Sequence, residues 1–116
     1  MDAFYTINTK EITGNNWNIN LSLNADHPVY QGHFPEKAIA PGVMLTEMVK
    51  NIIEDEWQTK LKMKAARNIK FLNMMLPEEA SSVDLILDVD REEEIKVKAE
   101  AKIGEDTYFK ISATFE

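Results

Sequence analysis

Residues 33–47 read HFPEKAIAPGVMLTE, and the rest of the chain is organised around this stretch. Pro41 fixes its own φ near the helical value and has no N–H to lose, so Ala40-Pro41-Gly42 predicts the entry to a helix. The amides of Gly42 and Val43 would then point out of the helix at the positive end of its dipole. A carbonyl oxygen that gains negative charge would be stabilised there, and Gly42 lets such a ligand approach closely.

Two ionisable side chains flank this predicted helix entry. His33 lies upstream in a loop punctuated by Gly and Pro, and an imidazole that titrates near neutral pH is suited to accept a proton. Glu47 lies five residues past Gly42, and a helical wheel places it on the side away from the apolar stripe. An acid in that position needs a cover before it is desolvated enough to hold a proton for delivery. A second subunit over that face would supply the cover, so we expect a dimer.

The composition limits the possible classes of protein. With 116 residues the chain is expected to form one domain, residues 1–116. A net charge of −7 makes it a poor general binder of nucleic acid, since Lys and Arg supply most of that affinity. The absence of cysteine excludes disulfides and thiol nucleophiles. The sequence shows neither a signal peptide nor an apolar run of ~18 residues, so we expect no membrane span and a cytoplasmic location.

The hydrophobic pattern predicts one helix and six strands. An apolar stripe at helical spacing marks a helix from residue 42 to about residue 57: Leu45, Met48, Val49, Ile52, Ile53 and Trp57. The strands are expected at residues 3–9, 16–24, 66–76, 82–90, 94–103 and 107–115, with an ordered loop at 25–40. This order predicts an α+β domain in which an antiparallel sheet wraps one central helix.

The run HPVYQGHFP at residues 27–35, continued through Pro41-Gly42-Val43 to Glu47, carries a family resemblance. It resembles the active-site segment of the (3R)-3-hydroxyacyl-[acyl-carrier-protein] dehydratases, the FabA/FabZ-like family, over residues 27–51. The resemblance implies a hot-dog fold, His33 as catalytic base, Glu47 as catalytic acid, and Gly42 with Val43 as the binding site for the thioester carbonyl. It also implies a substrate carried on acyl carrier protein, no cofactor, and a homodimer or higher oligomer.

Each active site in that family takes its histidine from one subunit and its acid from the other, which agrees with the position of Glu47 on the helical wheel. The chain departs from the family pattern at Glu36 and Ala38, and at Asn51, where the family frequently has Gln. These departures touch the loop and the surroundings of the acid. They bear on substrate preference more than on reaction type.

Further residues are expected around the site. Phe34 and Met44 are predicted to line a tunnel for the acyl chain, because Met44 shares the helix face of Glu47. Further candidates for this lining, most of which are expected to be plain core, are Met48, Met63, Phe71, Met74 and Met75. His27 is expected to brace the loop, and no metal site is predicted because the His and Glu spacing fits no usual ligand pattern. A basic cluster could dock an acidic carrier protein: Lys60, Lys62, Lys64, Arg67 and Lys70.

Two alternative functions stay open at this point. One is a hot-dog thioesterase, in which the acid activates water against the same bound carbonyl. The other is a noncatalytic acyl-binding subunit that keeps the cleft and turns nothing over. A histidine placed opposite an acid is not needed by a simple binder, so the GHFP motif favours the dehydratase.

Overall fold

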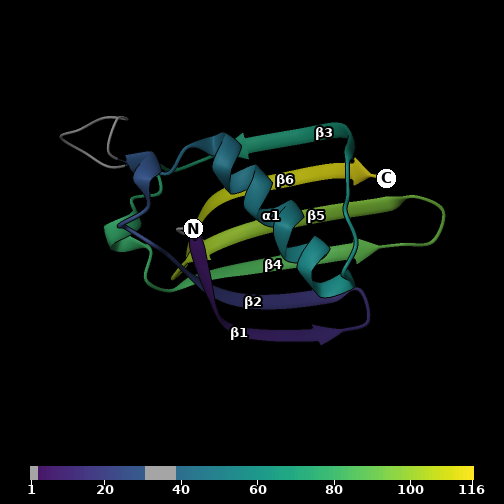
Figure 1. Cartoon of the computed structure of the whole chain (residues 1–116), viewed down its shortest axis with the longest axis horizontal. Helices are drawn as coiled ribbons and strands as arrows, with labels where there is room; N and C mark the ends of the chain where they lie inside the picture. Colours follow the sequence, from purple (N-terminus) through teal and green to yellow (C-terminus); the bar gives the residue numbers. More distant parts are fainter. Residues whose placement is uncertain (1–2, 31–38) are drawn as a thin grey trace.

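The computed structural model describes residues 3–30 and 39–116, in which one α-helix lies across one face of a six-stranded antiparallel sheet (Figure 1). The elements are β1 (Tyr5–Thr13), β2 (Asn16–Leu23), η1 (Pro28–Tyr30), α1 (Gly42–Trp57), β3 (Met63–Phe71), η2 (Pro77–Glu79), β4 (Val83–Asp90), β5 (Ile95–Ile103) and β6 (Asp106–Phe115). The strand order is β1-β2-β4-β5-β6-β3. The predicted α+β arrangement, a sheet around one helix, is confirmed.

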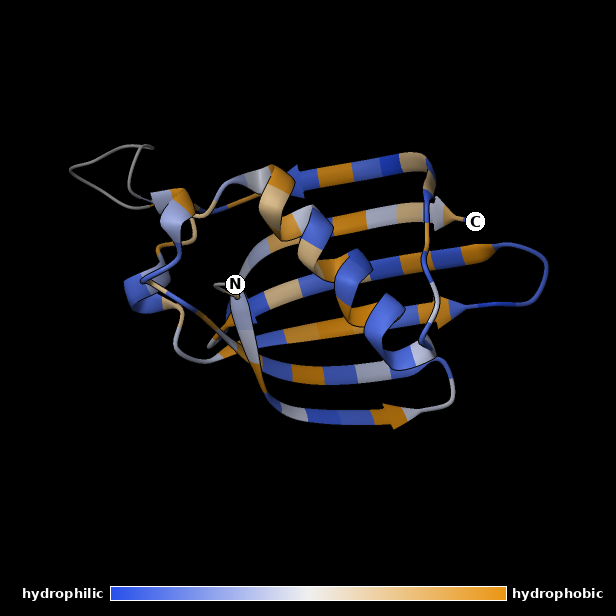
Figure 2. Ribbon diagram, in the orientation of Figure 1, coloured by the Kyte–Doolittle hydropathy of each residue, from blue (hydrophilic) through white to orange (hydrophobic). Residues whose placement is uncertain are grey.

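The core lies between α1 and the sheet face that it covers. Buried and exposed residues alternate along β2 and β4, as expected for strands with one face on a core and one in water. In Figure 2 the colours alternate along much of β2, whereas β4 shows an orange stretch in its middle. The predicted stripe of α1 is confirmed, with Trp57 only partly buried and these five residues buried: Leu45, Met48, Val49, Ile52 and Ile53. Each such side chain stabilises the fold by roughly 1.5–3 kcal/mol.

The two edge strands differ from the prediction. β1 was expected at residues 3–9 and runs from Tyr5 to Thr13, because an edge strand with mostly exposed polar residues lacks the apolar alternation that marks a strand. β3 was expected at residues 66–76 and runs from Met63 to Phe71. Its apolar continuation, Leu72 to Leu76, leaves the sheet instead.

The segment at residues 72–76 joins the end of β3 to the entry of α1. The N–H groups of Leu72 and Asn73 both donate to the carbonyl oxygen of Tyr108, at 2.8 and 3.3 Å. The N–H of Ala40 donates to the carbonyl oxygen of Met75 at 2.8 Å, and the Met75 side chain is buried. These bonds attach the chain just before α1 to the end of β3.

The loop predicted at residues 25–40 is described as far as Tyr30. The ring nitrogen Nδ1 of His27 accepts a hydrogen bond from the N–H of Val29 at 3.0 Å, and its ring meets Phe4 edge-on with centroids 5.6 Å apart. The expectation that His27 braces this loop is therefore confirmed. Residues 31–38 lie outside the described residues. In the part of the chain that is described, no helix has the length and apolar character needed to cross a membrane.

Candidate active site

The N-terminal end of α1 has the form that the sequence predicts. Pro41 precedes the helix with φ −65° and ψ 138°, and its carbonyl accepts the N–H groups of Met44 and Leu45. The amides of Gly42 and Val43 have no earlier carbonyl of the helix to bind. Among residues 3–30 and 39–116 they also find no backbone acceptor elsewhere. Among residues 3–30 and 39–116 no side chain caps this end either, so within this part of the chain the two amides have no partner and could bind an acceptor from outside.

Phe71, the last residue of β3, packs directly on Gly42. A Cβ placed on Gly42 would lie 2.8 Å from Cζ and 2.9 Å from Cε2 of the Phe71 ring, closer than real Cβ atoms come to other atoms. Only glycine allows this contact without a shift of the ring. The sequence predicts that a ligand approaches Gly42 closely. On one side of Gly42 that space is already occupied by the Phe71 ring.

An open groove with a volume of about 440 Å³ lies beside Gly42. It is lined by Ile39, Ala40, Gly42, Leu45, Phe71, Leu72, Asn73, Met74 and Met75. Its walls are mostly apolar. Three of the lining side chains are exposed to an unusual degree for their type, Phe71 at 48%, Leu72 at 52% and Met74 at 67%. Such a concave apolar surface next to two available amides suits a ligand with a carbonyl group and a hydrocarbon chain.

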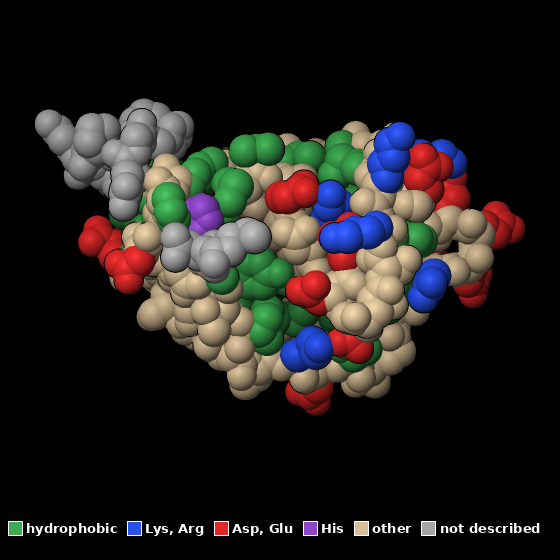
Figure 3. Space-filling model, viewed as in Figure 1, with side chains coloured by type: hydrophobic (Ala, Val, Ile, Leu, Met, Phe, Trp, Pro, Cys, Tyr) green, Lys and Arg blue, Asp and Glu red, His purple; other side chains and the backbone are tan. Residues whose placement is uncertain are grey.

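Glu47 lies on the exposed side of α1, as the wheel predicts, with its side chain 54% exposed. Its Oε1 accepts a hydrogen bond from the Nζ of Lys50 at 2.8 Å, one helical turn further on. This bond raises the pKa of Lys50 above its ordinary value, and the negative charge of Glu54 adds to the effect. Glu47 is not among the residues that line the groove. Figure 3, viewed from the α1 side, shows charged side chains of both signs on this face with hydrophobic ones between them.

Several predicted site residues cannot be placed against Glu47. His33 and Phe34 lie outside the described residues, as do the departures at Glu36 and Ala38. Met44 is partly buried against the core and does not line the groove. Of the further tunnel candidates, Phe71, Met74 and Met75 line the groove. Met48 is buried in the core and Met63 packs partly against it, and neither lines the groove. In residues 3–30 and 39–116, no cluster of three or more His, Asp or Glu side chains could hold a metal ion.

The basic cluster predicted at residues 60–70 is spread along the molecule. The N–H of Leu61 donates to Glu54 near the C-terminal end of α1, and Lys62 pairs through its backbone with Glu116. Phe71, at the other end of β3, packs on Gly42. A strand of nine residues separates its two ends by roughly 25 Å, so Lys60, Lys62 and Lys64 lie far from the helix entry and Lys70 lies near it.

Sequence reasoning missed Lys50 and Leu72. Lys50 follows Glu47 by three residues, so the helical ion pair could have been predicted from spacing alone. Leu72 was assigned to a strand, and nothing in its local sequence marks it as a groove residue.

The amino-acid sequence of this chain matches a family of dehydratases. The model of the ApeI-like family, described as ApeI dehydratase, matches residues 9–110. The 3-hydroxyacyl-[acyl-carrier-protein] dehydratase FabZ of Caldanaerobacter subterraneus subsp. tengcongensis is 28% identical over 102 residues, which cover 82% of this chain and 70% of that protein. FabZ of Thermoanaerobacter pseudethanolicus is 26% identical over 102 residues, which cover 82% of this chain and 69% of that protein.

Solved structures share the fold at low sequence identity. The dehydratase heterocomplex ApeI:P from Xenorhabdus doucetiae matches with a TM-score of 0.81 and 16% identity, over 95% of this chain and 96% of that one. An uncharacterized protein from Erwinia carotovora subsp. atroseptica matches with a TM-score of 0.67 and 18% identity, over 96% and 92%. At these identities the likeness is one of fold, and it agrees with the predicted hot-dog arrangement.

Proposed function

Because this chain belongs to the ApeI-like dehydratase family, we propose that it dehydrates (3R)-3-hydroxyacyl thioesters carried on acyl carrier protein to trans-2-enoyl thioesters. The observation that carries the proposal is the apolar groove that opens beside the available amides of Gly42 and Val43. The groove would take an acyl chain, and a thioester carbonyl would be an acceptor for those amides. The reaction would serve fatty acid, lipid or polyene-type biosynthesis.

The proposed mechanism moves one proton at each of two carbons. The Gly42 amide donates to the thioester oxygen, so the charge that develops there when C2 loses its proton is stabilised. His33 takes the C2 proton. Glu47, protonated, gives its proton to the C3 hydroxyl as the C3–O bond breaks, and water leaves as the C2–C3 double bond forms. A proton then returns from His33 to Glu47 through solvent, and no cofactor is consumed.

A second subunit would complete the site. Glu47 is exposed in the single chain, and every residue of the edge strand β3 after Met63 is exposed as well. An edge strand offers unpaired N–H and C=O groups to another strand. We propose that a second copy covers this side of the molecule, so that His33 of one subunit faces Glu47 of the other. The ApeI:P structure is a heterocomplex by its title, so a different dehydratase-like chain is the alternative occupant.

The Glu47–Lys50 ion pair favours a second candidate function. Glu47 is paired with the Lys50 ammonium at 2.8 Å, and an ion-paired carboxylate is the form that would activate water in a hot-dog thioesterase. In the dehydratase, closure of the second subunit would have to separate Glu47 from Lys50 before the acid step. The family match and the GHFP motif support dehydration over thioester hydrolysis.

One assay separates the possibilities. The purified protein is mixed with acyl carrier protein loaded with 3-hydroxyacyl groups of several chain lengths, and the products are followed by mass spectrometry. Loss of one water from the loaded carrier is expected, with His33→Ala and Glu47→Gln slowing it by roughly 10²–10⁴-fold each. Release of free carrier thiol would instead identify the thioesterase. Tight binding without turnover at any chain length would identify an acyl-binding subunit.

A further inference from the structure

We propose that the side-chain amide of Asn73 binds the arm that carries the acyl group, by accepting a hydrogen bond from the first amide N–H beyond the thioester sulfur. This inference rests on the proposed function and deepens it, because it assigns one side of the same groove to the arm and the other to the acyl chain. It makes Asn73 a specificity-determining residue, which distinguishes a thioester with that amide from other thioesters of the same length.

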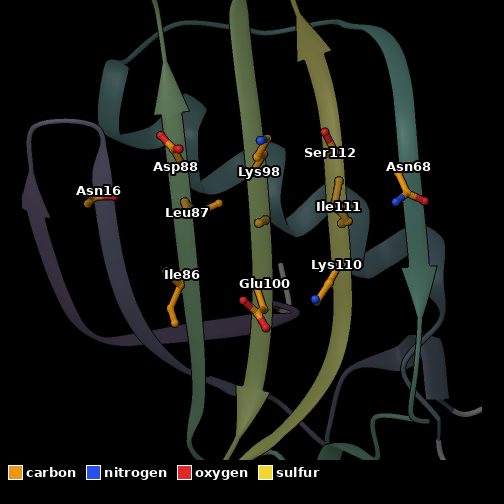
Figure 4. A pocket seen from close by; sticks show the side chains of 11 residues that line it. Asn16, Asn68, Ile86, Leu87, Asp88, Lys98, Glu100, Lys110, Ile111 and Ser112 are labelled. Carbon is orange, nitrogen blue, oxygen red and sulfur yellow. The ribbon is translucent and has the colours of Figure 1, made fainter.

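Asn73 differs in chemistry from the rest of the groove wall. Among the described residues that line the groove, it alone has a polar side chain. The hollow on the face of the sheet away from α1 is lined differently, with charged side chains of both signs that include Asp88, Lys98 and Glu100 (Figure 4). A few placed polar groups in an apolar site orient a ligand and provide specificity. The single polar side chain of the groove is therefore a candidate for such a contact.

The Asn73 side chain is held in one orientation. Its Nδ2 donates to the carbonyl oxygen of Thr107 at 2.9 Å, and its backbone N–H donates to the carbonyl oxygen of Tyr108 at 3.3 Å. A carbonyl oxygen can only accept, so the bond to Thr107 identifies which end of the amide is the nitrogen. In the described parts of the chain, Oδ1 has no donor partner. Because Asn73 is exposed, this oxygen is an acceptor that a ligand can reach.

The groove has a buried side and an exposed side. Leu45 and Met75 are buried, whereas Leu72 and Met74, the neighbours of Asn73 in the chain, are more than half exposed. Removal of a hydrocarbon chain from water is favourable, and the arm has to lead out to its carrier protein. The acyl chain therefore takes the buried side, and the arm leaves past Asn73.

The chemistry of the substrate leaves one kind of donor for Asn73. The thioester carbonyl is an acceptor for the Gly42 amide, and the C3 hydroxyl faces Glu47 in the proposed mechanism. The remaining N–H donors are the amides of the arm, and the first is four bonds from the carbonyl carbon, roughly 5 Å in an extended chain. Asn73 follows Phe71, which packs on Gly42, by two residues, or at most about 7 Å of chain. An N–H of the arm is thus within reach of Asn73 while the carbonyl stays at Gly42.

The experiment compares two thioesters in three proteins. One is the hexanoyl thioester of N-acetylcysteamine, which reproduces the first amide of the arm, and the other is the S-(2-acetoxyethyl) thioester, in which an oxygen replaces that N–H. Neither has a 3-hydroxyl group, so dehydration cannot consume them during a calorimetric titration. The proteins are wild type, Asn73→Ala and the control Asn24→Ala. Asn24 also donates through Nδ2 to a backbone carbonyl, that of Ala3 at 2.8 Å, but it does not line the groove.

Wild type is expected to bind the amide thioester roughly 2–10-fold more tightly than the ester, the effect of one neutral hydrogen bond. Asn73→Ala should bind the two alike, and Asn24→Ala should keep the wild-type preference. A purely structural role of Asn73 would weaken both thioesters together and overturn the inference, as would equal binding of the two, or of neither, by wild type.

Turnover of carrier-bound 3-hydroxyacyl groups is followed separately. A wild-type protein that prefers the amide thioester but removes no water would refute the proposed function and keep the assignment of Asn73. Turnover without any preference for the amide would have the opposite meaning.

Discussion

The two ends of α1 differ in how their backbone groups are hydrogen-bonded and in how their side chains are packed. At the C-terminal end, Gln58 takes the left-handed conformation and its N–H donates to Glu54, whose carboxylate also accepts the N–H of Leu61. The Trp57 ring meets Trp17 edge-on at 6.1 Å and carries the Arg91 guanidinium at 4.1 Å. At the N-terminal end, no side chain of the described residues caps the helix.

Exposure follows the same division. Val43 is 76% exposed, and the neighbouring groove side chains of Leu72 and Met74 are more than half exposed. Large apolar groups left in water cost the isolated protein stability that burial would provide. One end of the helix is closed by packing and hydrogen bonds, and the other keeps amides and apolar surface available. The C-terminal end thus contributes to the stability of the fold, and we propose that the N-terminal end binds the ligand and the partner.

Truncation of one aromatic residue at each end should give opposite results. Trp17→Ala removes a side chain that is 3% exposed and should lower the free energy of unfolding by about 3–5 kcal/mol. Phe71→Ala removes a ring that is 48% exposed and should cost under about 1.5 kcal/mol, yet raise KM for acyl substrates because a groove wall is lost. Urea unfolding and steady-state kinetics on both variants provide the measurement. Equal destabilisation by the two substitutions would remove the distinction between the ends.

Tyr30, which precedes α1 in the chain, has a polar group that lacks a hydrogen-bond partner. Its hydroxyl is buried without a hydrogen-bond partner among the described residues, and burial raises the pKa of Tyr30 from 10.0 to about 12. The unfolded chain ionises first as pH rises, so the stability contribution is complete below pH 10 and is lost between pH 10 and 12. The loss should be about 2–3 kcal/mol.

Unfolding by urea at a series of alkaline pH values checks this, with Tyr30→Phe as the control. In the control, the free energy of unfolding should fall less steeply with pH, and the remaining fall should be due to Tyr5. The pKa of Tyr5 is also raised to about 12, by burial and by the charges of Asp55 and Glu54. An identical slope in the two proteins would show that Tyr30 ionises as freely in the folded state as in the unfolded one.

The contact between Gly42 and Phe71 predicts the smallest effect. Gly42→Ala introduces a methyl group against the ring and should destabilise the protein by about 1 kcal/mol, since the half-exposed ring can move part of the way. In the Phe71→Ala background the same change should be neutral or stabilising, because Ala forms helix better than Gly. A double-mutant cycle on urea unfolding measures the coupling, and additive effects would contradict the contact.

The fold was largely predictable because its signals are local. Pro41-Gly42 and the apolar stripe define α1 without reference to the rest of the chain, and the stripe is buried as expected. The end of β3 was not predictable in this way. Residues 72–76 are as apolar as a strand, but the register with β6 ends at Phe71. Leu72 and Asn73 share the carbonyl of Tyr108, and the carbonyl of Met75 accepts the N–H of Ala40, so the partners of this segment are distant in sequence.

The candidate site was predictable only in part. Gly42 and Val43 offer their amides as expected, because a helix start has the same geometry in any context. The basic residues at 60–70 are spread along an extended strand, which their closeness in sequence does not reveal, and their role in docking a carrier protein stays a prediction. The pairing of His33 with Glu47 depends on an assembly, which no local pattern encodes, and it stays a prediction.

The most direct measurement of the composite site is the activity of mixed inactive variants. His33→Ala and Glu47→Gln are each purified, shown to be folded and nearly inactive, then mixed in equal amounts and allowed to exchange subunits. If each site takes its base from one subunit and its acid from the other, half of the dimers carry one intact site, and activity should return to roughly a quarter of wild type. Mixed dimers that are detected by mass spectrometry and remain inactive would contradict the account.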